Sequence, residues 1–224
     1  MYIKVNGAEL FYEKEGSGPP LVLVHGNGED HFIFDECAEA LRGMFTVYRP
    51  DSRGHGKSSR TREMHYQAMA DDLVCFIKEL GLQKPVLYGF SDGGIIGLLI
   101  ASQHPGLLSR LIVSGANLNP RGLKASVYCF FRLLFLFKKD PGIGMMLTEP
   151  DIDKEDLKRI QIPVWVTAGQ RDMVRESHTR TIAEQIPGSR LILLKGQSHS
   201  SYVVHSTRLP QIIKEATKDI ERQS

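Results

Sequence analysis

The sequence predicts an α/β fold built on a mostly parallel sheet, and two observations carry this prediction. Continuously apolar runs such as residues 21–24 (LVLV) are typical of parallel strands that are buried on both faces. Such runs alternate with helix-like segments through short connections, and this alternation indicates a sheet covered by helices on both faces. The length of 224 residues allows one domain with a sizeable core.

The elements can be placed in order along the chain. Asn6-Gly7 separates two short strand-like runs and predicts a hairpin within residues 1–15. Helices are expected at 66–80, where Gly81 ends the pattern, at 92–104 and at about 201–220. The remaining strands are expected at 21–24, 45–48, 85–90, 110–113, 164–167 and 191–194.

One segment breaks the alternation. Residues 117–159 separate two core segments, 1–116 and 160–224, and contain the apolar run 127–137. Because the aromatic residues of this run fall on too many faces for one amphipathic stripe, we predict a short lid over the carboxyl edge of the sheet. The alternative is a crossover helix that only packs on the core. As part of a lid, Phe130, Phe131 and Leu134 are expected to line a substrate pocket.

Composition excludes several classes of protein. The net charge is +2 and the basic residues look scattered, so we expect neither nucleic acid nor an anionic membrane as a partner. The run 127–137 is too short to span a membrane and is interrupted by Arg132. The first residues enter a strand pattern without a leader signal. The three cysteines lack metal-site spacing, which predicts reduced, mostly buried thiols, no metal site and a cytoplasmic protein: Cys37, Cys75 and Cys129.

The most informative motif is residues 89–94, GFSDGG. It follows an apolar strand and precedes a helix, the setting in which a tight turn raises a nucleophilic serine above the sheet. Glycines on both sides of Ser91 are expected because a side chain there would collide with the neighbouring helix and strand. The alternative is an ordinary turn with a capping serine.

A serine hydroxyl needs a base, and the base needs an acid that orients it. Asp172 follows the strand at 164–167 and His199 follows the strand at 191–194, so the chain order is serine, aspartate, histidine. Carboxyl ends of parallel strands share one edge, which predicts that the three residues meet. Other candidates fit less well: Glu176 at a helix start, His178 and His205 in helical patterns, and His25 and His55 in earlier loops, His25 being expected to support its loop by hydrogen bonds.

Acyl transfer also requires backbone donors for a negatively charged oxygen. The residue after the nucleophile supplies one donor, the amide of Asp92. The second is expected from the loop after the strand 21–24, where glycines flank Asn27 and allow its amide to turn inward. We therefore predict an oxyanion hole formed by the backbone N–H groups of Asn27 and Asp92.

These motifs give the chain a resemblance to the α/β-hydrolase family over essentially its whole length. The resemblance is carried by residues 25–28 (HGNG), 51–56 (DSRGHG) and 89–94, together with the acid and histidine loops. It implies an eight-stranded sheet with a lid after the sixth strand and no cofactor. Residues 91–94 are similar to the valacyclovirase-like, biphenyl-hydrolase-like group, from which this chain departs by its short lid. Serine disfavours the epoxide-hydrolase and dehalogenase branches, which use aspartate.

The expected function is hydrolysis of a small ester, thioester or amide through an acyl-enzyme. The Asp92 carboxylate could pair with a substrate ammonium, as in amino-acid esters, or could simply be an acid at a helix N-terminus. A second interpretation is carbon–carbon bond hydrolysis or a lyase reaction, which the fold also supports, and a ligand-binding protein with little turnover is a third. The sequence is silent on the physiological substrate and on the oligomeric state.

Overall fold

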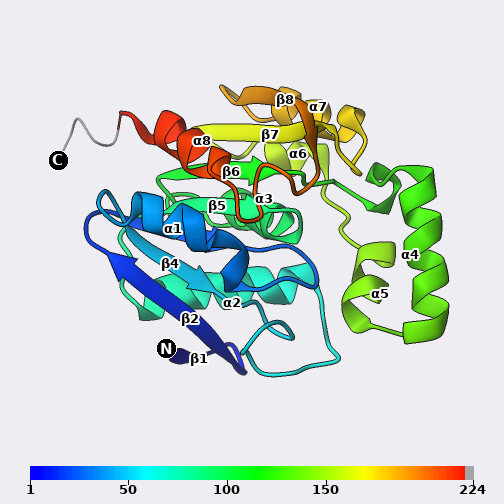
Figure 1. Ribbon diagram of the computed structural model, residues 1–224, viewed down its shortest axis with the longest axis horizontal. Coiled ribbons are helices and arrows are strands. Elements are labelled where there is room, and N and C mark those ends of the chain that lie inside the picture. The colour runs from blue at the N-terminus through cyan, green and yellow to red at the C-terminus, as the bar shows by residue number, and fades with distance from the viewer. Residues whose placement is uncertain (220–224) are drawn as a thin grey trace.

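An eight-stranded sheet forms the centre of the computed structural model, which describes residues 1–219 (Figure 1). The strand order is β1-β2-β4-β3-β5-β6-β7-β8. Strand β2 pairs antiparallel with β1 and with β4, and every later pair is parallel. The mostly parallel sheet predicted from the apolar runs is confirmed. The strands are β1 Tyr2–Val5, β2 Ala8–Gly16, β3 Pro20–Val24, β4 Thr46–Pro50, β5 Val86–Phe90, β6 Arg110–Ser114, β7 Val164–Arg171 and β8 Arg190–Ser198.

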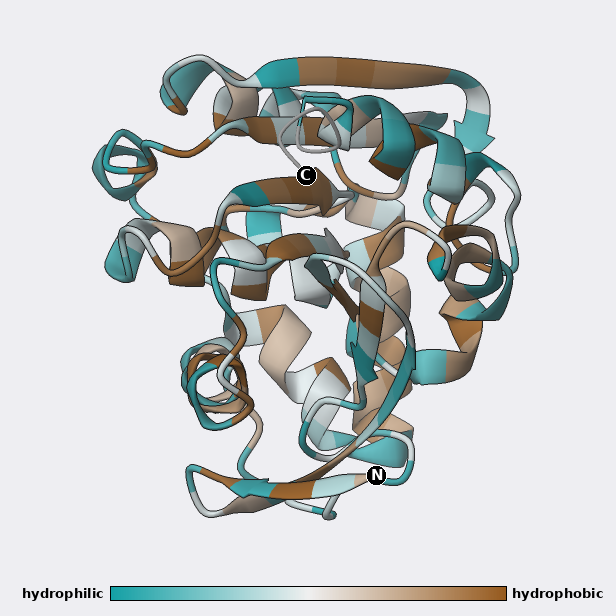
Figure 2. Cartoon of the chain, turned by 90° about the vertical axis from the view of Figure 1, so that its left-hand side faces the viewer, coloured by the Kyte–Doolittle hydropathy of each residue, from teal (hydrophilic) through white to brown (hydrophobic). Residues whose placement is uncertain are grey.

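Helices cover both faces of this sheet. Alternate residues of β3 face opposite sides, so that Leu21 and Leu23 join one buried cluster while Val22 and Val24 join the other. The first cluster also contains residues of α1 and α8, and the second contains residues of α2, α3, α6 and α7. Figure 2 shows brown, hydrophobic stretches along the strands between these layers. The helices concerned are α1 Asp35–Leu41, α2 Tyr66–Glu79, α3 Asp92–Gln103, α6 Lys154–Leu157, α7 Glu176–Gln185 and α8 Arg208–Thr217.

The inserted segment 117–159 contains α6 and two further helices, α4 (Ala125–Lys138) and α5 (Pro141–Thr148), preceded by the 3₁₀ turn η2 (Pro120–Gly122). Helices α4 and α5 pack against each other and stand at one end of the molecule, beyond the sheet (Figure 1). The Ile152 N–H donates to the Leu118 carbonyl oxygen at 2.9 Å, where the segment leaves and rejoins the core. None of the helices in the described part of the chain is long and apolar enough to cross a bilayer.

Two expectations from the sequence are wrong in part. Helix α8 begins at Arg208 rather than near Ser201, and Ile220 lies outside the described residues. Proline is tolerated only in the first turn of a helix, so Pro210 favours a start just before it, and residues 201–205 form turns. The thiols are free, as expected, but only Cys37 is buried and Cys129 on α4 is exposed.

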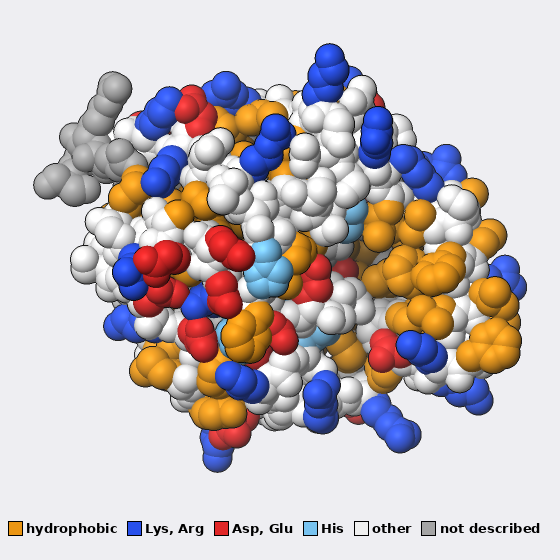
Figure 3. Space-filling view, in the orientation of Figure 1, with side chains coloured by type: hydrophobic (Ala, Val, Ile, Leu, Met, Phe, Trp, Pro, Cys, Tyr) orange, Lys and Arg blue, Asp and Glu red, His pale blue; other side chains and the backbone are white. Residues whose placement is uncertain are grey.

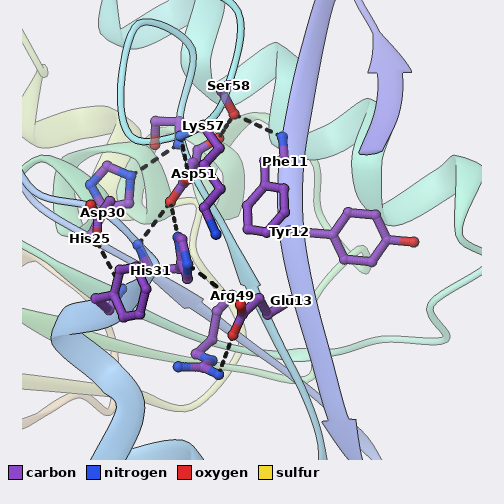
Figure 4. A network of polar contacts seen from close by, with 12 residues as sticks. Phe11, Tyr12, Glu13, His25, Asp30, His31, Arg49, Asp51, Lys57 and Ser58 are labelled. Atoms are coloured by element: carbon purple, nitrogen blue, oxygen red, sulfur yellow. Dashed lines mark hydrogen bonds and ion pairs between the residues drawn. The ribbon is translucent and has the colours of Figure 1, made fainter. Parts of the chain in front are cut away.

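A buried polar network holds the glycine-rich turn after β4 against the 3₁₀ turn η1 (His31–Phe34) (Figure 4). Asp51 Oδ1 accepts from the His31 N–H at 2.8 Å and lies 2.7 Å from His31 Nδ1. The other carboxylate oxygen, Oδ2, accepts from the Lys57 N–H at 2.8 Å. Atoms of Asp30, His31 and Asp51 that could coordinate a metal ion lie within 4.8 Å of one another. The hydrogen bonds to Asp51 explain why these side chains cluster, because they anchor the two turns to each other.

Candidate active site

Ser91 lies on a sharp turn between β5 and α3. Its backbone angles are φ 53° and ψ −113°, and a positive φ is strained for a residue with a side chain. A Cβ on Gly89 would lie 2.1 Å from the Gly93 carbonyl oxygen, and one on Gly93 would lie 2.2 Å from the Val24 carbonyl oxygen. The backbone contacts on each side of the serine therefore require glycine, for the reason predicted from the motif.

The three residues expected to form a triad come together at the carboxyl edge of the sheet. His199 Nε2 lies 3.1 Å from Ser91 Oγ, and His199 Nδ1 lies 2.6 Å from Asp172 Oδ1. Asp172 directly follows β7 and His199 directly follows β8. A hydroxyl, an imidazole and a carboxylate thus form one hydrogen-bonded chain, the arrangement that allows a serine oxygen to lose its proton to a base.

Neighbouring groups fix the orientation of the imidazole and the carboxylate. Asp172 Oδ1 also accepts from the Val174 N–H at 2.9 Å. The His199 ring lies 4.9 Å from the Phe90 ring, and a Cβ on Gly115 would lie 2.7 Å from His199 Cε1. Gly115, with φ +65°, leaves the space that the imidazole occupies. Packing therefore holds the imidazole, and a backbone hydrogen bond holds the carboxylate.

The loop after β3 lies against the serine. A Cβ on Gly26 would lie 3.0 Å from Ser91 Cβ, so the backbone approaches the hydroxyl closely at this point. The Gly26 N–H donates to Glu29 Oε2 at 2.9 Å, and the Gly26 carbonyl oxygen lies 2.7 Å from His25 Nδ1. His25 Nε2 accepts from the Ser52 N–H at 3.0 Å, and burial lowers the pKa of His25 to about 4, which keeps the ring neutral. His25 supports its loop by hydrogen bonds, as expected.

Asp92 is buried directly after the serine. Tyr66 donates its hydroxyl to Asp92 Oδ1 at 2.7 Å, and Oδ2 is buried without a close hydrogen bond among residues 1–219, although the Asn27 side-chain amide lies near enough to this carboxyl to lower its pKa. Burial raises the pKa of the Asp92 carboxyl, and burial likewise raises the pKa of the Tyr66 phenol, which therefore remains a donor. Tyr66 thus satisfies one oxygen of Asp92, and the other has only the neutral side chain of Asn27 near it.

A cavity of about 200 Å³ surrounds these groups. The insertion contributes Asn117, Leu123, Phe131 and Met146 to its wall. Asn27 and Asp92 line the cavity beside the serine. Two of the residues expected here are elsewhere: Phe130 is 60% exposed, and Leu134 is half-buried on α4 outside the lining of this cavity. The lining residues are Gly26, Asn27, Glu29, Tyr66, Phe90, Ser91, Asp92, Asn117, Leu123, Phe131, Met146, Met173, Val174, His199 and Ser200.

Sequence reasoning missed Glu29, a second carboxyl group in this wall. Burial raises the pKa of Glu29 from 4.5 to about 6, although the Gly26 N–H that it accepts lowers it. Glu29 could have been chosen from the sequence because it lies four residues after His25, in the loop already expected beside the serine. Met146 and Met173 could not be predicted as cavity residues. Nothing in the sequence distinguishes a methionine that lines a cavity from one that packs in the core.

The other candidates for base and acid occupy other places. Glu176 begins α7 and accepts from Arg180 Nε at 2.7 Å. His178 lies within α7, as expected, and its Nδ1 accepts from the Leu118 N–H at 3.3 Å. His205 was expected in a helix but lies in a turn with φ 45°, where its Nδ1 is 2.9 Å from Glu36 Oε2.

Known proteins share this architecture, and some are similar in sequence along most of this chain. The family model for the α/β hydrolase fold matches residues 19–127. The human protein "Serine hydrolase BPHL" is 28% identical over 235 residues, covering 90% of this chain and 80% of the relative. The protein named "Putative carbamate hydrolase RutD" from Caulobacter sp. (strain K31) is 31% identical over 241 residues, covering 85% of this chain and 88% of the relative.

Solved structures agree on the fold. A thermophilic esterase from Thermogutta terrifontis superposes with a TM-score of 0.82 at 24% identity, covering 99% of each chain. At this identity the likeness concerns the fold alone. The sheet, the serine turn and the match to RutD along most of both chains support one conclusion. This chain belongs to the α/β-hydrolase family.

Proposed function

We propose that this protein is a serine hydrolase that cleaves a small ester, thioester or amide through an acyl-enzyme intermediate. The observation that carries the proposal is the hydrogen-bonded chain from Ser91 Oγ through His199 to Asp172, with distances of 3.1 and 2.6 Å. In this mechanism Ser91 attacks the carbonyl carbon and His199 takes its proton, then returns it to the leaving group. Asp172 holds the imidazole in the tautomer that presents Nε2 to the serine.

Two backbone N–H groups complete the proposed mechanism. Asn27 and Asp92 lie in the cavity wall beside the serine, and Asp92 stands at the N-terminus of α3, where the helix dipole favours negative charge. Their amides are proposed to hold the oxyanion of the tetrahedral intermediate. One such donor is worth about 3 kcal/mol of barrier lowering in related chemistry.

We propose that segment 117–159 forms a lid, through its helices α4 and α5, over a core formed by residues 1–116 and 160–224, whereas α6 at the end of the segment packs on the core. Phe131 of α4 and Met146 of α5 reach the cavity wall, and a Cβ on Gly142 of α5 would lie 2.9 Å from the Asn27 amide. The insertion therefore touches the loop proposed to bind the oxyanion. The cavity of about 200 Å³ is below the usual range for drug-sized ligands, which supports a small acyl group.

The direct test is labelling with a fluorophosphonate probe combined with turnover of a p-nitrophenyl ester. We expect the probe to label Ser91, and Ser91→Ala to lower ester turnover by at least about 10⁴-fold because no nucleophile remains. Ser200→Ala is the matched control, since Ser200 lines the same cavity outside the hydrogen-bonded chain. Labelling without turnover would favour the ligand-binding alternative. Full turnover in Ser91→Ala would contradict the proposed nucleophile.

A finer proposal concerns the substrate. Asp92 lines the cavity, and its Oδ2 is buried with no close hydrogen bond among the described residues and only the neutral Asn27 amide near the carboxyl, so a substrate ammonium would supply a charged partner. We expect Asp92→Asn to lower the ratio of aminoacyl-ester to neutral-ester hydrolysis by about 10- to 100-fold, because asparagine keeps the bond from Tyr66 and loses the charge. Glu176→Gln, which removes a charge outside the cavity, should leave the ratio unchanged. An unchanged ratio in Asp92→Asn would leave the carboxylate as an acid at a helix N-terminus only.

A further inference from the structure

Helix α4 presents a stripe of large apolar side chains to solvent. Phe130 is 60% exposed, Leu133 56%, Leu136 65% and Phe137 80%. Their spacing of three, three and one residues keeps them on one side of a helix with 3.6 residues per turn. Figure 3 shows hydrophobic side chains gathered at the end of the molecule where α4 lies. Contiguous apolar surface of this kind marks a place that another molecule covers.

The opposite side of α4 is already in use. Phe131 lines the cavity, and a Cβ on Gly144 of α5 would lie 2.9 Å from the Phe135 ring, which shows how closely the two helices pack. The exposed stripe faces away from these contacts, and no residue of α4 is fully buried. The aromatic residues that were too many for one amphipathic stripe thus divide between an inner face and an outer face.

Charge indicates what covers the outer face. Residues 117–139 contain five basic residues and no acidic residue, and α4 carries two of them, Arg132 and Lys138, both exposed. Blue side chains border the apolar patch in Figure 3. The net charge of +2 for the whole chain hides this local excess, so the expectation of scattered basic residues does not hold here. The five are Arg121, Lys124, Arg132, Lys138 and Lys139.

A second copy of the chain is a poor match for this surface. A two-fold symmetric contact brings the same patch of both copies together and would set these basic residues near their own duplicates. An acidic phospholipid surface offers apolar tails to the phenylalanine and leucine side chains and phosphate groups to the lysine and arginine side chains. Helices that lie in the membrane interface combine these two features.

We propose that α4 docks this protein onto the surface of a bilayer that contains anionic phospholipid. The helix lies in the plane of the interface, with Leu133 and Phe137 among the acyl chains and Arg132 and Lys138 at the phosphates. Docking is peripheral, consistent with the lack of a membrane-spanning helix in the described residues. Because Phe131 belongs to the same helix, α4 connects the lipid surface with the cavity. Docking does not depend on the proposed chemistry at Ser91.

Co-sedimentation with vesicles tests the proposal. We expect at least ten-fold tighter binding to vesicles of phosphatidylcholine with phosphatidylserine than to phosphatidylcholine alone, weakening as salt screens the charges. The variant Leu133→Gln/Phe137→Gln should bind at least ten-fold more weakly. Tyr2→Gln is the matched control, since Tyr2 is 58% exposed on β1, away from the insertion. Thermal unfolding should be alike for these proteins, because every substituted side chain is exposed.

A second variant removes two positive charges from α4. Arg132→Gln/Lys138→Gln should lose the preference for phosphatidylserine, and Lys4→Gln/Arg62→Gln, with the same loss of charge at other exposed positions, should keep it. Binding unaffected by both α4 variants would overturn the proposal, as would failure of the wild-type protein to bind. Self-association that Leu133→Gln/Phe137→Gln abolishes, without vesicle binding, would assign the stripe to a second copy and also overturn it. Ser91→Ala should bind vesicles like the wild type, which separates this result from the proposed function.

Discussion

Helices α3 and α4 are both rich in apolar residues, yet one is buried and the other is not. In α3 almost every residue is buried, whereas in α4 none is. The difference lies in side-chain size at the contacts. A Cβ on Gly97 of α3 would lie 2.7 and 2.8 Å from methyl groups of Leu111 and Leu87, so glycine lets the helix sit directly on the sheet. Helix α4 has no glycine and carries large side chains on every face.

The comparison shows that apolar content alone does not determine where a helix is buried. Small residues on one face allow a helix to approach strands closely and gain contacts on all sides. Large residues on all faces hold the helix at a distance, and charged residues such as Arg132 keep part of it in water. Core helices and interface helices can thus share a composition and differ in their small residues.

The largest effect is expected from a substitution that prevents the close approach of α3 to the end of β3. Gly93→Ala would place a Cβ 2.2 Å from the Val24 carbonyl oxygen and 3.0 Å from that of His25, and both are backbone atoms that cannot move aside cheaply. We expect a loss of about 3 kcal/mol or more in the free energy of unfolding, measured by urea denaturation. Ser126→Ala on the exposed side of α4 serves as control. Wild-type stability in Gly93→Ala would refute the packing argument.

An intermediate effect is expected at the cavity, where core and insertion meet. Because the pKa of Glu29 is raised from 4.5 to about 6, the folded protein holds this proton more tightly than the unfolded chain. The protonated Glu29 carboxyl therefore stabilises the folded state below pH 4.5. This contribution to the free energy of unfolding, up to about 2 kcal/mol, is lost as the pH rises through about 6.

Glu29→Gln isolates this effect, since glutamine still accepts from the Gly26 N–H and does not ionise. The difference in unfolding free energy between wild type and Glu29→Gln should shift in favour of the variant as the pH rises from 4 to 7, and stay level above that. Urea denaturation at a series of pH values measures it. A difference independent of pH would mean that Glu29 titrates like an exposed glutamate.

The smallest effect is expected on the outer face of α4. Leu136 is 65% exposed, so Leu136→Gln removes little buried surface and should change the free energy of unfolding by less than about 0.5 kcal/mol. Thermal unfolding measures this against Leu136→Ala. A loss above about 1 kcal/mol would show that other parts of the protein cover the stripe. Helix α4 would then be buried as α3 is, and the contrast between the two helices would fail.

The parts of the molecule that the sequence predicts well are those with glycine at close backbone contacts. Gly89 and Gly93 predict the turn at Ser91, because two glycines around a serine between a strand and a helix are typical of this turn and of few other structures. Asp172 and His199 could be chosen from chain order and from their positions after strands. Their distances from the serine required the structure, since they depend on how loops converge.

The insertion shows where prediction from the sequence stops. Phe131 reaches the cavity and Phe130 does not, although the two are adjacent and equally apolar. A helix with apolar residues on all faces has no periodic signal that says which face turns inward. Glu29 was missed for a different reason: its raised pKa follows from burial by distant segments, which no local pattern records.

A hydrogen bond between Leu118 and Ile152, at 2.9 Å, joins the start of the insertion to the point where the chain returns to the core after α5. The chain between them can therefore change in length while the sheet keeps its connections, because closing a longer loop costs little extra entropy. Evolution or design could replace this segment with another and alter which molecules reach Ser91, leaving in place the loops that hold Ser91, His199 and Asp172. Access to the serine and the framework that holds it are separable parts of this architecture.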